Sequence, residues 1–291
     1  MGHNHSHDHS NKNLKIAFFL NLGFTILEIF GGIYTNSIAI ISDAVHDLGD
    51  SLAIGTSWFL EVKSKKTANK HYSFGYNRLS LLGAVINALV LIIGSSFVIY
   101  NAINRIITPE PSDANGMLLF ALFGILINGY AAWKLSNSKT MNEKVISWHL
   151  IEDVLGWVAV LIVSIILKFK DIQYLDPLLS MFITLYILWN VGSRLKESVF
   201  LFLQGTPLDI NQEEIETKLL AIDKIASLHN LHIWSLDGEQ HVFTVHICLK
   251  DIATNKDIIE VKQVIKLILE NYHFKHITIE TELEGEPCLV T

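Results

Sequence analysis

The chain of 291 residues is half hydrophobic, and its mean hydropathy of +0.36 exceeds what a soluble domain of this length needs for its core. This composition excludes a wholly soluble globular protein and predicts a membrane protein with a soluble appendage. The net charge of −7 is unevenly distributed, because the chain from Leu208 onward carries fifteen acidic residues against seven lysines while the preceding part is near neutral.

The chain begins with the segment MGHNHSHDHS, in which histidines alternate with small polar or acidic residues. With almost nothing apolar to pack, residues 1–13 are expected to be disordered. A weak metal-gathering role and a merely solubilising role both stay open for these histidines (His3, His5, His7 and His9). No cleavable signal peptide is expected, because the first apolar run is too long for the hydrophobic region of one.

Six apolar segments of near-spanning length follow. Crossing a hydrocarbon core of about 30 Å takes about 20 helical residues at about 1.5 Å per residue. The segments lie near residues 14–34, 38–61, 79–103, 116–135, 145–168 and 177–200. The sequence therefore predicts an α-helical membrane protein whose six-helix transmembrane domain covers residues 14–204, just before Gly205, Thr206 and Pro207.

Positively charged side chains in the short loops predict the orientation of these helices. The loop between the second and third helices carries five of them, Lys63, Lys65, Lys66, Lys70 and Arg78, whereas the loop between the first and second has none. Loops rich in Lys and Arg face the cytoplasm, so both termini are expected on that side. The short loops and the lack of targeting signals favour a bacterial plasma membrane.

Residues 205–291 are expected to form an acidic cytoplasmic domain. Helical periodicity at 211–222 and 255–272, with strand-like patterns at 226–236, 241–249 and 276–283, predicts the order αββαβ. This order is typical of a small α+β sandwich of the ferredoxin-like kind. The two cysteines, Cys248 and Cys288, do not indicate a disulfide framework, which agrees with a reducing compartment.

The second predicted helix contains an unusual polar stretch, SDAVHDLGDSL, at residues 42–52. A charged side chain at the centre of a bilayer costs about 2.5 to 3.5 kcal/mol on insertion scales, so such residues need a partner. At about 100° per residue, Asp43, His46, Asp47 and Asp50 fall within an arc of about 100° and form one polar stripe. The stripe must face protein or water.

The fifth predicted helix contains a similar polar stretch, SWHLIEDVLGW, in which His149 and Asp153 have the same spacing as His46 and Asp50. Residues four apart are neighbours on a helix surface, so two facing helices can supply two imidazole nitrogens and two carboxylate oxygens. That set suits tetrahedral Zn²⁺, whose ligand distances are about 2.0–2.2 Å. Magnesium and calcium favour more oxygens.

Other interpretations of these polar residues stay open. An intramembrane His or Asp can simply make hydrogen bonds between helices, and Asp43 with Asp47 has the same spacing as the favoured pair. Glu152 points about 60° away from the direction shared by His149 and Asp153. The polar residues of the first helix, Glu28 and Asn21, are expected to make interhelical hydrogen bonds.

The chain resembles the cation diffusion facilitators, membrane carriers that export zinc and related divalent ions, over nearly its whole length. The resemblance rests on ISDAVHDLGD in the second helix, SFGYNRLSLLGA at the start of the third, SWHLIEDVLGW in the fifth, LDPLLSMFITLYILWNVGSRLKESVFLFLQGTP through the sixth, and LHNLHIWSLDGEQHVFTVHI in the tail. It implies cytoplasmic termini, a metallochaperone-like C-terminal domain, a homodimer and exchange of metal ions for protons. It also implies a transport site made of His46, Asp50, His149 and Asp153.

Two further metal sites occur in many members of this family. In the loop between the second and third helices, this chain has Asn69, Tyr72 and Tyr76 at the places where some bacterial members carry Asp and His, and His71 is one residue away. We therefore expect no metal site there, and interpret the basic loop as a signal of topology and a contact with lipid.

The resemblance implies the second further site in the tail, where His229, His246 and Glu282 match a cytoplasmic zinc site of the family. Alternative ligands are His232, His241 and Cys288. Exposed strand histidines without a metal are the competing interpretation, because strand spacing alone does not show that these side chains converge. A filled site would bring two tails together and bias the membrane helices.

The sequence thus predicts a proton-coupled Zn²⁺ exporter that works by alternating access, with Cd²⁺, Co²⁺ and Fe²⁺ as further candidate substrates. Metal and protons compete for the same imidazole and carboxylate atoms, and the unperturbed pKa of histidine is about 6.5. The competing functions are a membrane-embedded zinc hydrolase and a metal-sensing receptor. A hydrolase needs an open metal position, which two matched pairs would fill, and a receptor has no need of the intramembrane pairs. We expect no enzymatic activity, no organic cofactor and no nucleic-acid partner.

Overall fold

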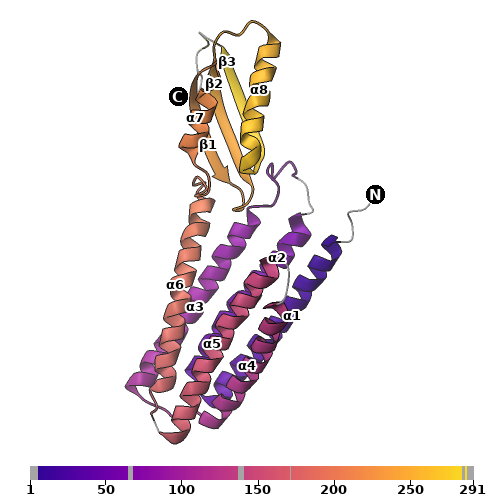
Figure 1. The fold of residues 1–291 in the computed structure, drawn as a ribbon. Helices are drawn as coiled ribbons and strands as arrows, with labels where there is room; N and C mark the ends of the chain where they lie inside the picture. Colours follow the sequence, from indigo (N-terminus) through magenta and orange to yellow (C-terminus); the bar gives the residue numbers. More distant parts are fainter. Residues whose placement is uncertain (1–5, 65–67, 137–140, 171, 284–285, 287–291) are drawn as a thin grey trace. The chain divides into compact units, whose positions relative to one another are not determined.

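The computed structural model describes residues 6–64, 68–136, 141–170, 172–283 and 286. The chain divides into two compact units, residues 1–62 with 83–195 and residues 63–82 with 196–291. Long helices make up the first unit, and a small sheet with its helices makes up most of the second (Figure 1).

Six long helices come first along the chain. They are α1 (Ser6–Thr35), α2 (Ile38–Ser64), α3 (Leu79–Ile107), α4 (Ala114–Ser136), α5 (Met141–Phe169) and α6 (Leu175–Phe202). Among the described residues, five of these helices are long and apolar enough to cross a membrane; the exception is α2. Its 27 residues are sufficient in length, about 40 Å, but its three aspartates lower its hydropathy. The predicted helical membrane fold is confirmed.

Helix α1 begins earlier than the sequence analysis expects. It starts at Ser6, so residues 6–13 are helical. The prediction that these residues are disordered is therefore wrong. Polar residues such as Lys12 and Asn13 can extend a helix that the apolar residues after them have already nucleated. The first five residues lie outside the described part of the chain, and the side chains of His7 and His9 do as well, so a metal-gathering role stays a prediction.

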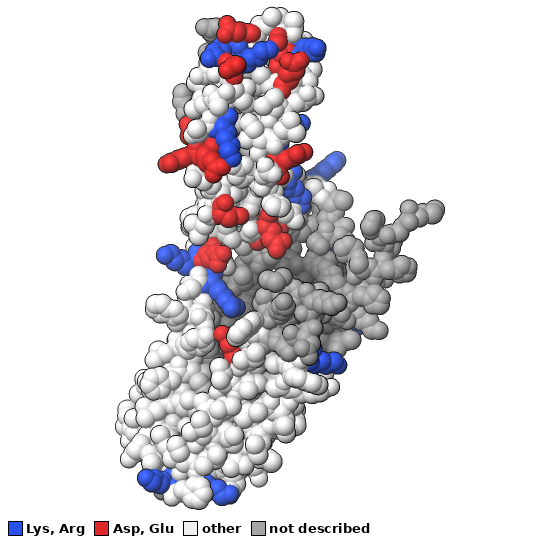
Figure 2. All heavy atoms as spheres, in the orientation of Figure 1, with Lys and Arg blue, Asp and Glu red and all other residues white. Residues whose placement is uncertain are grey.

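Large apolar side chains cover the outside of the long helices. Phe97, Leu126 and Trp189 are between 63% and 76% exposed, whereas Ala102 and Ala121 are fully buried. On the face shown in Figure 2, the described surface of these helices carries few charged side chains between its ends. Bulky apolar residues outside and small residues inside are what a helix bundle in lipid requires.

The start of α2 is held by a carboxylate from α6. The buried Asp176 accepts hydrogen bonds from the backbone N–H of Ile38 at 2.8 Å and of Ala39 at 3.3 Å, and from the hydroxyl of Ser37 at 2.5 Å. The first N–H groups of a helix lack partners within the helix, so Asp176 satisfies donors that would otherwise be buried unpaired. A second link follows along the same helices, where the Ser42 and Thr184 hydroxyls lie 2.7 Å apart.

The tail has the predicted αββαβ order. Its elements are α7 (Gln212–Leu220), β1 (Ile225–Ser235), β2 (His241–Leu249), α8 (Asn255–Leu269), a short 3₁₀ helix η1 (Glu270–Tyr272) and β3 (Phe274–Leu283). The sheet order is β1-β2-β3, with β1 antiparallel and β3 parallel to β2. The parallel pair requires a crossover, which α8 provides.

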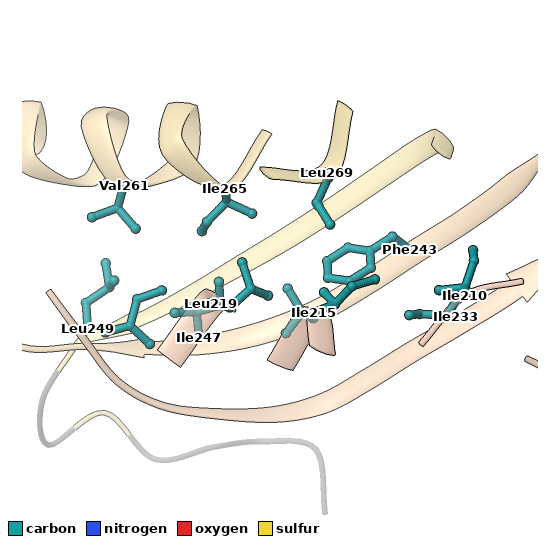
Figure 3. Close-up of a cluster of buried hydrophobic side chains, with 12 residues drawn as sticks. Ile210, Ile215, Leu219, Ile233, Phe243, Ile247, Leu249, Val261, Ile265 and Leu269 are labelled. Atoms are coloured by element: carbon teal, nitrogen blue, oxygen red, sulfur yellow. The ribbon is translucent and has the colours of Figure 1, made fainter. Parts of the chain in front are cut away.

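The core of the tail lies between the sheet and its two helices. Phe243, Ile247 and Leu249 of β2 meet Ile215 of α7 and Ile265 of α8 in this core (Figure 3). Alternate residues of a strand point to opposite faces, so the residues between the core positions of β2, including position 246, lie on the face away from the helices.

Helix α8 begins with a capping box formed by Thr254 and Asp257. The carboxylate of Asp257 accepts from the Thr254 backbone N–H at 2.7 Å and also pairs with the Lys224 ammonium. The hydrogen bond from Lys224, with further hydrogen bonds from Thr254, holds the pKa of Asp257 well below its usual range. The carboxylate is therefore charged at every pH above its ordinary pKa of about 3.9, and the cap weakens only when the pH falls below that value.

Residues 69–76, which lie between α2 and α3, form a compact polar turn. The side-chain oxygen of Asn69 accepts from the backbone N–H groups of His71 and Tyr72, each at 2.9 Å, and its amide donates to the Tyr76 hydroxyl at 3.0 Å. The rings of Tyr72 and Tyr76 lie 4.8 Å apart. These groups bind one another, and the absence of a metal site in this loop stays a prediction.

Candidate metal centres

A polar cluster lies between α2 and α5, and each helix contributes one histidine and one aspartate. Ligand atoms of His46, Asp50 and His149 all lie within 4.8 Å of one another. Asp153 extends the cluster, because its Oδ1 is 3.9 Å from Nε2 of His46. The structure therefore brings together all four residues that the spacing singles out; the i,i+4 geometry of two facing helices is sufficient to do so.

The contacts within this cluster are unequal. His149 Nε2 is 2.7 Å from Asp50 Oδ2, a hydrogen bond, whereas His46 Nε2 is 3.7 Å from the same oxygen. The two imidazole rings are 5.6 Å apart and nearly perpendicular. The side chains are partly buried, from 10% exposed for Asp153 to 37% for His149. Ligand atoms of His46, Asp50 and His149 thus face one small space, with Asp153 beside His46. Two nitrogens and two oxygens are a donor set that tetrahedral zinc accepts.

The alternative pair, Asp43 and Asp47, lies deeper in the bundle. Both residues are only 6% exposed. Asp43 points toward α5, because its Oδ1 would lie 3.6 Å from a Cβ atom placed on Gly156. Among the described residues, neither belongs to a group of three or more potential ligands within 4.8 Å. The geometry therefore favours the pairing of His46 with Asp50 as the metal-facing set.

Asn21 and Glu28 of α1 differ in their hydrogen bonding. Asn21 donates from its amide to the Asp47 carbonyl and to the Ser51 hydroxyl, each at 3.0 Å, so the predicted interhelical hydrogen bond is confirmed. Glu28 is 1% exposed, and neither of its oxygens meets a hydrogen-bond partner among the described residues. The corresponding prediction for Glu28 stays a prediction, because its neighbour on α2 is the carboxyl group of Asp47, with which it can form a hydrogen bond only when one of the two carboxyls is protonated.

A second cluster lies on the tail sheet, on the face away from α7 and α8. His229 Nε2 and His246 Nδ1 each lie 3.1 Å from Oε1 of Glu282, and the two rings are 5.4 Å apart. His229 and His246 are register partners on β1 and β2, and Glu282 comes from β3. Glu282 is only 8% exposed although it lies on the open face. Three strands thus place two nitrogens and one carboxylate around one point.

Two of the alternative tail ligands, His232 and His241, do not join this cluster. His232 pairs in register with Thr244 and lines a separate open pocket of about 420 Å³. A register shift between His229 and His232 separates the two β1 histidines, and Asn230 there has a φ of 49°. His241 is 3% exposed at the start of β2 and lies 3.9 Å from Asp209. Cys288 lies outside the described residues.

Two residues that link α6 to α2 or α5 were not predicted from the sequence. Asp176 anchors the start of α2, and the hydroxyl of Tyr186 on α6 donates to Oε1 of Glu152 at 3.4 Å. The Asp-Pro pair at residues 176–177 is a recognisable helix-start signal. No local signal predicts the Tyr186 contact, because it depends on how α5 and α6 pack.

The chain is similar to known proteins over nearly its whole length. Residues 14–203 match the family model of the cation efflux transmembrane domain, and residues 207–284 match that of the cation efflux protein cytoplasmic domain. A metal cation efflux system protein, CzcD, of Cupriavidus metallidurans is 34% identical over 99% of this chain and 92% of its own length.

The names of two further relatives state which metal ions they transport. A cadmium, cobalt and zinc/H(+)-K(+) antiporter of Bacillus subtilis is 33% identical over 98% of this chain and 93% of its own length. The zinc transporter ZitB of Escherichia coli is 29% identical over 99% of this chain and 94% of its own length.

Proposed function

Because the chain belongs to the cation diffusion facilitator family of efflux proteins, we propose that it exports Zn²⁺ from the cytoplasm in exchange for protons. Membership in this family makes the chain an integral membrane transporter of divalent cations and not an enzyme. The observation that carries the specific proposal is the convergence of His46, Asp50 and His149 within 4.8 Å, with Asp153 beside them.

The chemistry of the four side chains supports zinc as the substrate. Imidazole nitrogen and carboxylate oxygen are both ordinary zinc ligands, and four of them complete a tetrahedron without an added water. Cadmium, cobalt and iron(II) are further candidate substrates, because ligand type alone does not exclude them. The names of two relatives include zinc, which supports the same choice.

The imidazole and carboxylate groups of these four side chains also support exchange of the metal for protons. A metal ion needs neutral imidazole and ionised carboxylate, so each ion that binds displaces protons and each ion that leaves makes room for them. Alternating access would load the metal from the cytoplasm and release it on the other side as protons return. The name of the Bacillus subtilis relative, a cadmium, cobalt and zinc/H(+)-K(+) antiporter, supports coupling of this kind.

We further place both termini in the cytoplasm of a bacterial cell, with the protein in its plasma membrane and two copies forming a homodimer. The lysines and arginine of the loop between α2 and α3 support this orientation. The match of residues 207–284 to the cytoplasmic domain of cation efflux proteins supports pairing through the tail. In this arrangement the second cluster, His229, His246 and Glu282, would bind zinc as a regulatory ligand.

The test of the transport site removes one carboxylate at a time. Asp50→Ala or Asp153→Ala should abolish zinc uptake into proteoliposomes driven by a pH gradient, because each change deletes a charged ligand without leaving a large cavity. Proton movement, followed with a pH-sensitive dye, should be lost together with zinc movement. A suitable control is Glu110→Ala, which removes an exposed carboxylate from the loop between α3 and α4. Near-normal zinc flux in either aspartate variant would disprove the four-ligand site.

A further inference from the structure

Glu152 lies beside the transport cluster but is not one of its four proposed ligands. It is one turn of α5 beyond His149, and its Oε2 is 3.8 Å from Nδ1 of that histidine. Its other oxygen, Oε1, accepts a hydrogen bond from the hydroxyl of Tyr186 at 3.4 Å. The side chain is 57% exposed, so the carboxylate lies at the open side of the cluster.

The two histidines of the cluster are supported differently. His149 has a carboxylate at each ring nitrogen, because Asp50 lies 2.7 Å from Nε2 and Glu152 lies near Nδ1. His46 presents Nε2 to the cluster, while its Nδ1 is buried without a hydrogen-bond partner among the described residues. An imidazole can bind a cation through Nε2 only if its remaining proton is on Nδ1, and that N–H then needs an acceptor. For His149, Glu152 is the acceptor within reach.

We propose that Glu152 is a positioning residue that keeps the proton of His149 on Nδ1 and the ring turned so that Nε2 faces the transported cation. Tyr186 in turn holds Glu152 from α6. The chain of contacts runs from Tyr186 through Glu152 and His149 to Asp50, and therefore links α6 to the cation through α5. This inference rests on the proposed function of the cluster as the transport site.

The side-chain contacts give this task to Glu152 and not to its neighbour Asp153. Positions i and i+3 adjoin on a helix surface, so Glu152 adjoins His149. The following residue, Asp153, turns its carboxylate toward His46, with Oδ1 3.9 Å from that ring. The two adjacent carboxylates of α5 thus have different roles. Asp153 is a ligand beside His46, and Glu152 is a hydrogen-bond acceptor for Nδ1 of His149.

The test measures zinc uptake into proteoliposomes over a range of zinc concentrations. Glu152→Ala should raise the KM for zinc roughly 10- to 100-fold, the range found when the partner of a metal-binding histidine is removed, with a much smaller change in kcat. Glu152→Gln should restore the KM to within a few-fold of the unmutated value, because its amide oxygen still accepts from Nδ1–H. Tyr186→Phe should raise the KM about five-fold, the effect of losing one hydrogen bond.

A matched control variant and two contrary outcomes complete the test of the role of Glu152. Glu197→Ala removes another exposed carboxylate, from α6, and should leave the KM unchanged. If the Glu152→Gln variant behaved like the Glu152→Ala variant, the negative charge and not the acceptor would matter, and the positioning role would be disproved. Unchanged KM values in both Glu152→Ala and Tyr186→Phe would also disprove it. Failure of the unmutated chain to carry zinc would instead disprove the proposed function.

Discussion

The ligand atoms between α2 and α5 lie close to the separations that a bound zinc ion requires. Tetrahedral ligands about 2.0–2.2 Å from a zinc ion are about 3.3–3.6 Å from one another. The His46 contacts with Asp50 and Asp153, at 3.7 and 3.9 Å, need to shorten slightly, whereas the 2.7 Å contact of His149 with Asp50 needs to open. A cation bound by these side chains would therefore replace one direct hydrogen bond and draw Asp153 toward the other three residues, because Asp153 lies outside the group whose ligand atoms are within 4.8 Å of one another.

Substitution of His46 tests how this donor set selects its cation. His46→Asp replaces an imidazole nitrogen with a carboxylate oxygen and shifts the set toward oxygen, which suits larger cations with more ligands better than it suits tetrahedral zinc. We expect cadmium transport to gain relative to zinc transport. The measurement is the ratio of cadmium to zinc initial rates in proteoliposomes, with His232→Asp in the tail as a control for the added charge. An unchanged ratio would show that His46 does not discriminate between the two ions.

Much of this residue-level arrangement could be predicted from the sequence, and the reason is local geometry. The pairing of His46 with Asp50 and of His149 with Asp153 depends only on the helical repeat. The contact of Tyr186 with Glu152 depends on the packing of two helices, which single-sequence periodicity does not determine. The same applies to Asp176, whose place at the start of a helix is predictable but whose partners on α2 are not.

At the scale of elements, α4 and α5 pack closely because glycine allows it. A Cβ atom on Gly124 of α4 would lie 2.3 Å from the buried indole ring of Trp157 on α5. At Gly129, five residues further along α4, the nearest atom would be a Val154 methyl carbon at 3.9 Å, which is ordinary van der Waals contact. The first glycine is therefore required by the helix contact, and the second is not.

These two glycines form a matched pair for a stability test. Gly124→Ala should destabilise the protein by about 1–3 kcal/mol through overpacking against Trp157, and lower its melting temperature in detergent. Gly129→Ala should be neutral or slightly stabilising, because alanine favours a helix over glycine by up to about 1 kcal/mol. Thermal unfolding followed by fluorescence-detected size exclusion compares them. Equal melting temperatures for the two variants would contradict the close contact between α4 and α5.

The tail elements show where prediction from sequence succeeds and where it stops. The order αββαβ follows from periodicity and turn residues, and each strand agrees with its predicted span to within two residues. The register shift in β1 at Asn230 does not follow from them, although it decides that His229 joins Glu282 while His232 lines another pocket. A positive φ at a single asparagine is a weak signal within an apparently regular strand.

At the scale of the whole molecule, the chain combines two candidate metal-binding clusters with different surroundings. The first is built from membrane helices and the second from the strands of a polar α+β unit. A ligand of the second cluster can affect transport only by favouring one conformational state over another, with a coupling free energy of about 1–3 kcal/mol in typical cases. The expected effect of losing the tail cluster is therefore slower export and not its abolition.

Removal of one tail histidine distinguishes this regulatory role from a place on the transport route. His246→Ala deletes one member of the tail cluster and should lower the zinc bound per protomer of the full-length chain, measured by equilibrium dialysis and metal analysis. It should also weaken self-association, measured by size exclusion with light scattering, yet leave appreciable flux when zinc saturates the membrane site. His232→Ala is the matched control, because that histidine lies on the same sheet but outside the cluster. Unaltered zinc binding in the His246→Ala variant would exclude a tail site, and complete loss of flux at saturating zinc would exclude a purely regulatory one.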